Sequence, residues 1–582
     1  LKNFIKKAQE ILTTRDKKNI SISIVLLIIK SILEVIGIGL IIPILTYTTS
    51  QNEDKFLYEN LPFLQRFDNQ QLILFFVIIF VFVYLIKTLF NIFYNSWSAR
   101  FTNNLSVSLT NRVLKKYLNK GYIFFLENNP SFFVRNITSE TSLFAMGLIG
   151  NLITCFTQIF FIFSVCLFLV IYNFYSFYVI LFLLIVCGII MKTLNNKFKK
   201  WGLVRLNESA LFLKKINEII GSVKEVILYN KREFFADDVH IHSKKLAKAN
   251  IYRDTALAFS APIVEFIAIF IFFSFFLILI IYSSIDLSEV TVLFGVFAFA
   301  CVKLLPAATS LLRSLQAIKF NMPACDAVYD ILINSNSNVS NNFSDTEKYK
   351  KTILNSIKFE NISFSYKNQK NPTLDQVNFE INKGDKIAII GETGSGKTTL
   401  LNIIATLVTP SNGKITINGS DQLDGFKEIR NNVGYVPQSV YLSDNSIISN
   451  ISLSNEFSLE DEDKILTILK SLNLSLINNR PIDLYNTIGD RGSKLSGGQI
   501  QRIGIARALF RDPSILILDE ATNALDAKTE KKILDNISKM FEDKFIILCT
   551  HKKELLKYCN KILEIKNNTV IFKTSKIDNI IK

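Results

Sequence analysis

The sequence predicts a helical membrane domain followed by a soluble α/β domain. Apolar runs without any charge, such as residues 72–85 and 159–171, lie before residue 320, whereas residues 340–582 have the mixed composition of an ordinary α/β domain. The chain of 582 residues is 49% hydrophobic with a mean hydropathy of +0.29, which is high for a soluble protein. An apolar run at 386–390 leads directly into a glycine-rich loop. The fold class is therefore an α-helical membrane domain plus an α/β P-loop nucleotide-binding domain.

We expect the membrane domain to span residues 19–333 and to hold six transmembrane helices, each needing about 20 apolar residues. Their centres lie near residues 32, 83, 157, 183, 270 and 300. The segments after the second and fourth helices keep a helical pattern without Gly/Pro clusters, which predicts cytoplasmic hairpins that extend about 25 Å beyond the bilayer. At the hairpin ends, residues 122–126 and 221–227 are expected either to dock as short helices on the soluble domain or to pack within the hairpins.

The formal charge of +16 is distributed as in a membrane protein rather than a nucleic-acid-binding one. Residues 100–141 carry six Lys or Arg against two acids, and residues 192–254 carry fourteen against seven. The opposite loop, with Asp286 and Glu289, is acidic. This asymmetry places both termini and the soluble domain in the cytoplasm. We therefore expect a multi-pass membrane protein with no nucleic-acid partner.

Three flanking segments have distinct compositions. Residues 1–18 are basic and amphipathic and lack a small-residue cleavage site, which favours a helix on the cytoplasmic membrane surface over a signal peptide. Residues 48–71 are too polar to span and predict either a short amphipathic helix on the outer leaflet or an ordered loop. Residues 334–351 are rich in Asn and Ser and predict a linker. The nucleotide-binding domain then covers residues 352–582.

The glycine-rich loop predicts a phosphate-binding site for ATP. Its glycines allow backbone N–H groups to surround the β- and γ-phosphates. Lys397 supplies a compact positive charge, and the Thr398 hydroxyl is a ligand for Mg²⁺. The predicted phosphate-binding residues are Gly391, Glu392, Thr393, Gly394, Ser395, Gly396, Lys397, Thr398 and Thr399.

A second apolar strand, residues 515–520, ends in two adjacent carboxylates. We expect Asp519 to hold Mg²⁺ through water and Glu520 to orient or deprotonate the attacking water. Both would lie at the carboxyl edge of a parallel sheet, where ligands bind. His551 follows another apolar strand and predicts a γ-phosphate contact, with a purely structural histidine as the alternative. The predicted catalytic residues are thus Lys397, Glu520 and His551, and the cofactors are ATP and Mg²⁺.

These motifs resemble the ABC transporter superfamily over the whole soluble part. The resemblance implies that Tyr366 stacks on adenine, that Gln438 contacts Mg²⁺ and that Asp526 belongs to the D-loop. It also implies that the signature motif LSGGQ of one subunit closes over ATP held by another. Small residues that open a helix near Gln499 would suit this anion contact. The expected partner is a second copy of the chain, or alternatively a different half-transporter. The signature residues are Ser496, Gly497, Gly498 and Gln499.

In the membrane part, residues 33–43, 98–101 and 302–307 and the external segment resemble the flippases of bacterial protein N-glycosylation. The resemblance implies an exporter in the bacterial inner membrane that moves a polyisoprenyl-pyrophosphate-linked oligosaccharide. A multidrug, lipid or peptide exporter is an alternative, and an ATP-gated channel or regulator is an alternative of another class.

Charged residues in the predicted spans are candidates for substrate contact, because intramembrane charge is costly and usually faces a cavity or a partner. Lys303 and Arg313 would attract a pyrophosphate into a water-filled cavity. Alternatively, they pair with Glu34 or Glu265, or Arg313 extends to the membrane interface. The predicted substrate residues are Lys303, Arg313 and Glu34.

Overall fold

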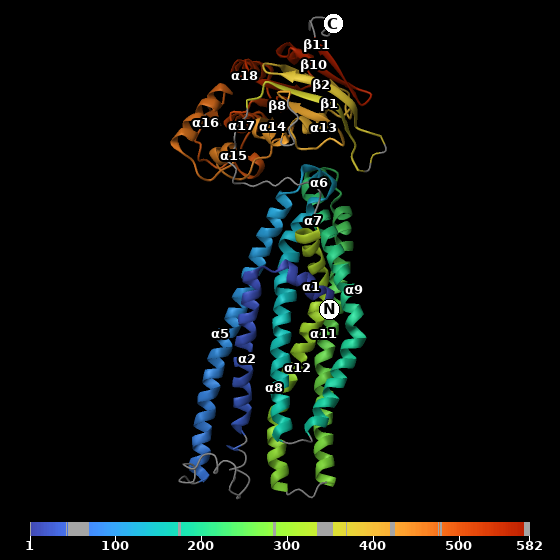
Figure 1. The fold of residues 1–582 in the computed structure, drawn as a ribbon, viewed down its shortest axis with the longest axis vertical. Helices are drawn as coiled ribbons and strands as arrows, with labels where there is room; N and C mark the ends of the chain where they lie inside the picture. Colours follow the sequence, from blue (N-terminus) through green and yellow to red (C-terminus); the bar gives the residue numbers. More distant parts are fainter. Residues whose placement is uncertain are drawn as a thin grey trace. The chain divides into compact units, whose positions relative to one another are not determined.

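The computed structural model describes residues 2–41, 43–44, 69–172, 176–282, 287–334, 353–367, 369, 371–419, 425–474, 476–477 and 480–574. The chain divides into two compact units, residues 1–120 with 124–342, and residues 343–582 with 121–123 (Figure 1). The predicted external segment 48–71 and linker 334–351 lie outside the described residues, except that residues 69–71 belong to helix α5 (Asn69–Leu118) and Asn334 ends η4 (Asp330–Asn334).

The first unit is helical, and each of the six predicted centres falls within a helix. Five of its helices are long and apolar enough to cross a membrane. The sixth, α9, includes residues 176–196, whose side chains are not described. The prediction of a helical membrane domain is confirmed. The elements are α1 Lys2–Ile11, α2 Thr14–Gly39, α5 Asn69–Leu118, α6 Tyr122–Glu127, α7 Pro130–Arg135, η2 Asn136–Glu140, η3 Leu143–Gly150, α8 Asn151–Tyr172, α9 Ser176–Gly221, α10 Val223–Leu228, α11 Arg232–Tyr282, α12 Leu287–Tyr329 and η4 Asp330–Asn334.

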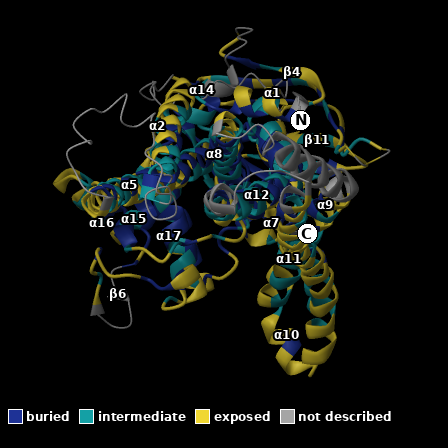
Figure 2. Cartoon of the chain, turned by 90° about the horizontal axis from the view of Figure 1, so that it is seen from below, coloured by how far each residue is buried: buried dark blue, intermediate teal, exposed yellow. Residues whose placement is uncertain are grey.

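Several helices are much longer than a bilayer requires, including α12 with 43 residues. Helices α5, α9 and α11 have 50, 46 and 51 residues, which gives each a length of about 70–75 Å against a hydrocarbon core of about 30 Å. Short helices, α6 and α10, stand at the two predicted hairpin ends. Figure 2 shows that the end around α10 is largely exposed, and Leu228 and Tyr229 there are 78% and 70% exposed.

The amphipathic N-terminal segment packs on protein. Phe4, Ile11 and Leu12 are buried in a cluster with side chains of α5 and α12. Helix α1 ends at Ile11 because Thr13 caps α2 through a capping box with Asp16. Residues 14–18, which the composition grouped with the amphipathic helix, therefore form the first turn of α2.

Helices α9 and α12 approach so closely that their backbones touch. A Cβ atom at Gly202 would lie 2.0 Å from the carbonyl oxygen of Phe320. At the next residue of α12, Asn321 Nδ2 donates to the carbonyl of Ala317 at 3.0 Å and points toward Gly147, where a Cβ atom would lie 2.7 Å from it. The small size of Gly202 and Gly147 therefore permits the contacts of α12 with α9 and with η3.

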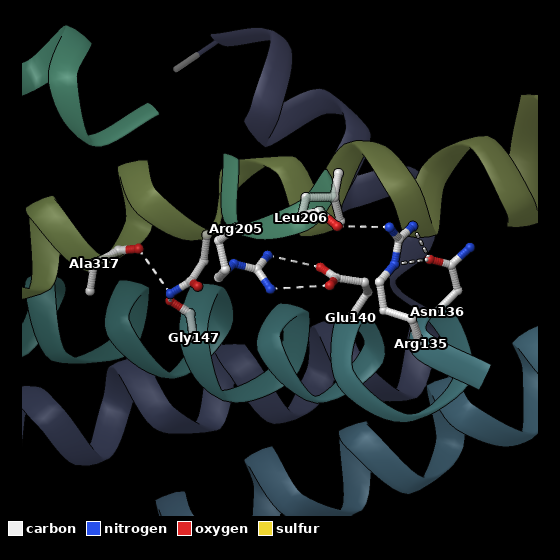
Figure 3. Close-up of polar contacts among 8 residues, drawn as sticks. Arg135, Asn136, Glu140, Gly147, Arg205, Leu206 and Ala317 are labelled. Atoms are coloured by element: carbon white, nitrogen blue, oxygen red, sulfur yellow. Dashed lines mark hydrogen bonds and ion pairs between the residues drawn. The ribbon is translucent and has the colours of Figure 1, made fainter. Parts of the chain in front are cut away.

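A buried ion pair joins α9 to the π-helical turn η2. Arg205 donates from Nη1 and Nη2 to the two carboxylate oxygens of Glu140, at 3.1 and 3.0 Å (Figure 3). Glu140 is 0% exposed and Arg205 is 7% exposed. Nearby, Arg135 donates from Nη1 to the carbonyl of Leu206 at 2.9 Å and from Nη2 to Asn136 Oδ1 at 2.7 Å. Two arginines and one carboxylate are thus enclosed among the helices.

The second unit contains a six-stranded sheet in the order β11-β10-β3-β9-β8-β5 and a three-stranded antiparallel sheet in the order β2-β1-β4. In the larger sheet, β10, β3, β9, β8 and β5 are parallel and β11 is antiparallel at the edge. The predicted α/β domain is confirmed. Its elements are β1 Ser356–Phe364, β2 Leu374–Asn382, β3 Lys386–Gly391, α13 Lys397–Ile404, β4 Asn412–Ile417, α14 Gly425–Asn432, β5 Val433–Val436, α15 Ile447–Ser452, α16 Leu459–Ser471, β6 Leu476–Ile477, β7 Arg480–Pro481, η5 Asp490–Gly492, α17 Gly497–Phe510, β8 Ile515–Asp519, α18 Ala527–Met540, β9 Phe545–Cys549, η6 Lys553–Tyr558, β10 Lys561–Lys566 and β11 Thr569–Thr574.

Candidate nucleotide site and membrane cavity

The predicted nucleotide-binding residues meet at one edge of the larger sheet. The neighbouring parallel strands β3, β9, β8 and β5 all end at this edge. The glycine-rich loop follows β3, His551 follows β9, Asp519 ends β8, and Gln438 follows β5. Four segments that are far apart in the sequence therefore converge where ligands of parallel α/β sheets bind.

The glycine-rich loop presents donors suited to phosphate. Gly394 and Gly396 have φ angles of +83° and +102°, in the left-handed region. Gly396 is the N-cap of α13 and provides no side-chain acceptor for the first-turn amides. Lys397 Nζ donates to the carbonyls of Gly391 and Glu392 at 2.9 and 2.8 Å. Ser395 Oγ is buried without a hydrogen-bond partner among the described residues. This donor set fits the phosphates of ATP.

Asp519 lies in a largely buried position beside a tyrosine. It is 8% exposed, and its Oδ2 accepts a hydrogen bond from the Tyr435 hydroxyl at 3.0 Å. Burial raises the pKa of Asp519, and the hydrogen bond from Tyr435 acts in the opposite direction. Asp519 and the Thr398 hydroxyl fit the oxygen ligands that Mg²⁺ prefers. Sequence reasoning missed Tyr435, whose only signal was its place on the strand that precedes Gln438.

We expect Tyr435→Phe to raise the Mg²⁺ concentration that half-maximal ATPase activity requires at low pH. The raised pKa of Asp519 means that its carboxylate is protonated at a higher pH than an ordinary aspartate, and protonation removes the Mg²⁺ ligand. Loss of the Tyr435 hydrogen bond raises this pKa further, so the acid side of the profile should move to higher pH. The measurement is the Mg²⁺ concentration for half-maximal ATPase between about pH 5.5 and 8. The exposed Tyr441→Phe is the control, and coincident profiles would contradict the role of Tyr435.

Glu520 is held by three neighbours. Its Oε2 accepts hydrogen bonds from Gln438 Nε2 at 2.8 Å and Asn523 Nδ2 at 3.0 Å, while its Oε1 lies 3.2 Å from His551 Nε2. Its φ of +49° is unusual for a residue with a side chain, and such backbone strain concentrates at functional sites. The structure thus brings together the predicted Gln438, Glu520 and His551 and adds Asn523, three residues before Asp526.

The signature motif opens a helix, but earlier than expected. Helix α17 begins at Gly497 rather than at Gln499, because Ser496 is its N-cap and forms a capping box with Gln499. Gly498 allows a close contact, since a Cβ atom there would lie 3.1 Å from the carbonyl oxygen of Ala524. Gln501, which sequence reasoning missed, accepts a hydrogen bond from the Ala524 amide at 2.9 Å. It braces α17 against the loop that follows Glu520.

Two further predicted residues have partners within the chain. The Asp526 carboxylate caps α18 by accepting from the Thr529 amide at 2.9 Å, and this bond lowers the pKa of Asp526. The Tyr366 hydroxyl lies 3.2 Å from Thr399 Oγ1, so the tyrosine ring stands beside the start of α13. Among the described residues, no hydrogen bond or ion pair connects 495–499 with 391–398 in the same chain.

The membrane domain contains a cavity of about 430 Å³ between α2, α8 and α12. Lys303 Nζ lies over the rings of Tyr84 and Phe299, at 5.6 and 5.8 Å from their centroids. Lys30 Nζ lies 5.0 Å from the centroid of Tyr94. Neither lysine has a carboxylate within ion-pair distance in the described part of the chain. The residues that line the cavity include Lys30, Glu34, Gln158, Phe161, Lys303 and Ala307.

The other two predicted substrate residues are placed differently. Glu34 lines the cavity, but its Oε2 pairs with Lys87 Nζ at 2.5 Å, and neither side chain is more than 15% exposed. The partner of Glu34 is therefore Lys87 and not Lys303 or Arg313. Arg313 is exposed and does not line this cavity. Ten residues along α12 separate it from Lys303, about 15 Å along the helix axis.

A chain that joins this phosphate-binding sheet edge to a membrane-spanning helical domain is an ATP-hydrolysing membrane transporter. Residues 374–523 match the ABC transporter family model, and residues 20–301 match the model of the ABC transporter transmembrane region, so the chain belongs to the ABC transporter family. The predicted resemblance to this superfamily is confirmed.

Named relatives agree with this assignment. The chain is 23% identical to an ATP-dependent lipid A-core flippase of Ralstonia nicotianae over 473 residues, which cover 81% of this chain and 79% of that protein. It is 37% identical to ABC transporter B family member 6 of Dictyostelium discoideum over 238 residues, or 40% of this chain and 35% of the relative's length. A solved bacterial Atm1-family ABC exporter with ATP bound has a TM-score of 0.77 at 18% identity, covering 97% of this chain and 96% of that one. The chain shares its fold.

Proposed function

We propose that the protein uses ATP and Mg²⁺ to flip an amphiphile with a phosphate-bearing headgroup, and that this amphiphile is a lipid-linked oligosaccharide. The observation that carries the proposal is the membrane cavity in which Lys30 and Lys303 lie without a carboxylate partner in the described part of the chain. A positive charge among membrane helices is costly unless it serves a ligand or a partner. The proposed location is the bacterial inner membrane.

The net charge of the residues at the cavity favours an anionic ligand. Glu34 and Lys87 neutralise one another, so the remaining charge near the cavity comes from Lys30 and Lys303. Two ammonium groups match the two or more negative charges of a pyrophosphate. Phe161 and Ala307 supply apolar surface in the same cavity, which suits the start of a lipid chain.

A second candidate substrate is a phosphorylated glycolipid. The relative from Ralstonia nicotianae is named a lipid A-core flippase, and such a headgroup would use the same two lysines. An uncharged drug would leave both lysines without a counter-ion, which makes the multidrug alternative less suited to this cavity.

We propose that the working unit is a dimer of this chain. Among the described residues, the signature residues 495–499 make no hydrogen bond or ion pair with the glycine-rich loop of their own chain, and amides at the start of α17 would suit the γ-phosphate bound by the partner. The exposed apolar side chains around α10, including Leu228 and Tyr229, supply surface for a subunit contact. A different half-transporter as partner remains the alternative, and crosslinking of single-cysteine variants at Leu228 in the purified chain separates the two.

The direct test is flipping in proteoliposomes. Purified protein is reconstituted with a polyisoprenyl-pyrophosphate oligosaccharide, and the ATP-dependent loss of glycan from the side that faces the nucleotide-binding domains is measured. Movement by the wild type and none by Glu520→Gln would support the proposal. Movement of a lipid A-core glycolipid alone would replace the oligosaccharide by the second candidate. Failure of both, with ATPase intact, would refute the anionic substrate.

We expect Lys30→Gln combined with Lys303→Gln to reduce flipping at least tenfold while basal ATPase stays within about twofold. Each lysine removed from a partly desolvated phosphate contact costs about 1.5–3 kcal/mol of binding. The measurement is the flipping rate against lipid concentration. Arg313→Gln is the matched control, because it removes a charge from α12 outside the cavity. Equal losses in the two variants would show that general charge, and not the cavity, is responsible.

A further inference from the structure

A second cavity, of about 520 Å³, lies between α9 and α11 and has a different composition. Four lysines and two aromatic residues supply most of its lining, namely Lys197, Lys200, Trp201, Lys245, Lys248 and Tyr252. The rings of Trp201 and Tyr252 are stacked, with centroids 5.6 Å apart. The cavity has basic and aromatic walls and lies apart from the α2, α8 and α12 cavity proposed for transport.

The lysines of this cavity are largely uncompensated. In the described ranges, Lys197, Lys200 and Lys248 have no carboxylate within ion-pair distance. Lys248 Nζ lies 5.7 Å from the centroid of Tyr252. Lys245 Nζ is 3.7 Å from Glu208 Oε1, and that carboxylate also accepts from His242 at 2.7 Å. The exposed lysines thus gather positive charge at the rim of the cavity, while their apolar stems and the two aromatic rings line it, which favours an anionic ligand at the rim.

The sequence places one end of this cavity, at Tyr252 and Lys197, near the membrane surface. Residues 176–191 of α9 contain no charged residue, and Glu265 is the only one in residues 256–282 of α11. Lys197 begins about 9 Å beyond the first of these apolar segments and Tyr252 about 6 Å beyond the second, at 1.5 Å per residue. The polar headgroup layer is about 5–8 Å thick on each side of the hydrocarbon core. Trp, Tyr and Lys are the residues that favour this layer.

We propose that this cavity binds the phosphate headgroup of an anionic phospholipid from the cytoplasmic leaflet. The ammonium groups contact the phosphate, and the stacked Trp201 and Tyr252 rings face the first carbons of the lipid. The proposal is independent of the transported substrate, because it concerns a resident membrane lipid at a separate cavity.

Trp201 makes the site directly observable. The chain has two tryptophans, and the other, Trp97, is stacked on Phe101 in α5. In a Trp97→Phe background, Trp201 is the sole tryptophan, and its emission is excited selectively over that of the tyrosines. The protein is reconstituted in phosphatidylcholine vesicles that contain an equal fraction of chain-brominated phosphatidylglycerol or chain-brominated phosphatidylcholine, and the quenching of Trp201 is compared. We expect about fivefold preferential quenching by the anionic lipid, the factor that one basic residue near an anionic surface supplies.

Two variants with equal charge loss test the residues. Lys197→Gln with Lys248→Gln should abolish the preference, whereas Lys199→Gln with Lys244→Gln, on the same helices but outside the cavity lining, should keep it. Equal quenching by both lipids in the parent protein would overturn the proposal. So would a preference that survives the cavity variant or disappears in the control. Loss of the preference in excess inorganic phosphate would assign the site to a soluble phosphate compound instead. Retained ATPase and a monodisperse elution profile show that each variant is folded.

Discussion

Glu520→Gln should lower the steady-state rate of ATP hydrolysis by about 10²–10⁴-fold, the contribution expected of a positioned general base. Glutamine keeps the shape of Glu520 but removes the charge that orients and deprotonates water. Two donors, Gln438 and Asn523, surround the same oxygen, so the amide finds partners without a large rearrangement. Nucleotide binding, measured with a fluorescent ATP analogue, should persist because the glycine-rich loop is unchanged.

The matched control for that variant is Glu542→Gln, which removes a carboxylate from an exposed position of the same domain. We expect it to leave the hydrolysis rate within about twofold of the wild type, because isolated exposed charges contribute little. Sustained turnover by Glu520→Gln at the rate of this control would show that another group activates the water.

Glu140→Gln should destabilise the membrane domain by about 3–5 kcal/mol, because it leaves the buried Arg205 without its counter-ion. Arg135 lies in the same enclosure, so the variant leaves two guanidinium groups without a nearby carboxylate. The melting midpoint of the detergent-solubilised protein should fall by about 10 °C. This fall in the melting midpoint does not depend on any change in ATP hydrolysis, since no residue of the nucleotide site takes part in the ion pair.

Two comparisons isolate the ion pair as the cause. The combined variant Glu140→Leu with Arg205→Met should recover most of the lost midpoint, because replacing both partners removes the uncompensated charge. Lys215→Gln breaks the partly exposed pairs with Asp238 and Glu218, and its midpoint should hardly change. If Glu140→Gln behaved like Lys215→Gln, the buried pair would have no special role in stability.

Sequence periodicity predicts the two-part fold because membrane spans and the strand before a phosphate loop have strong local signals. It also predicts that Glu520 and His551 meet the glycine-rich loop, since each follows an apolar strand and parallel strands end at one edge. The role of Gln438 was implied only by the resemblance to ABC transporters. The predicted start of α17 near Gln499 was wrong, because Ser496 and Gln499 cap each other and the helix begins at Gly497. Capping residues give a weaker signal in a sequence than a hydrophobic pattern does.

The interactions that sequence reasoning missed join residues that are distant in the chain. Tyr435 and Asp519 are 84 positions apart, and Arg205 and Glu140 are 65 positions apart. No spacing rule connects such pairs, because their proximity depends on how strands and helices pack. The same limit applies to Arg313. The sequence suggested that it contacts the cavity together with Lys303, but its side chain is not among those that line the cavity.

The contact at Gly202 has a mechanical consequence. With no room for even one carbon atom between that position and the backbone of Phe320, α9 and α12 cannot slide along one another unless they first separate. A transport cycle that keeps this contact must therefore move α9 and α12 together as one packed pair of helices. Lys303 lies on α12 too, beyond Pro306, so we expect a displacement of α9 at Gly202 to reach the cavity lysine along α12, with a bend at the proline.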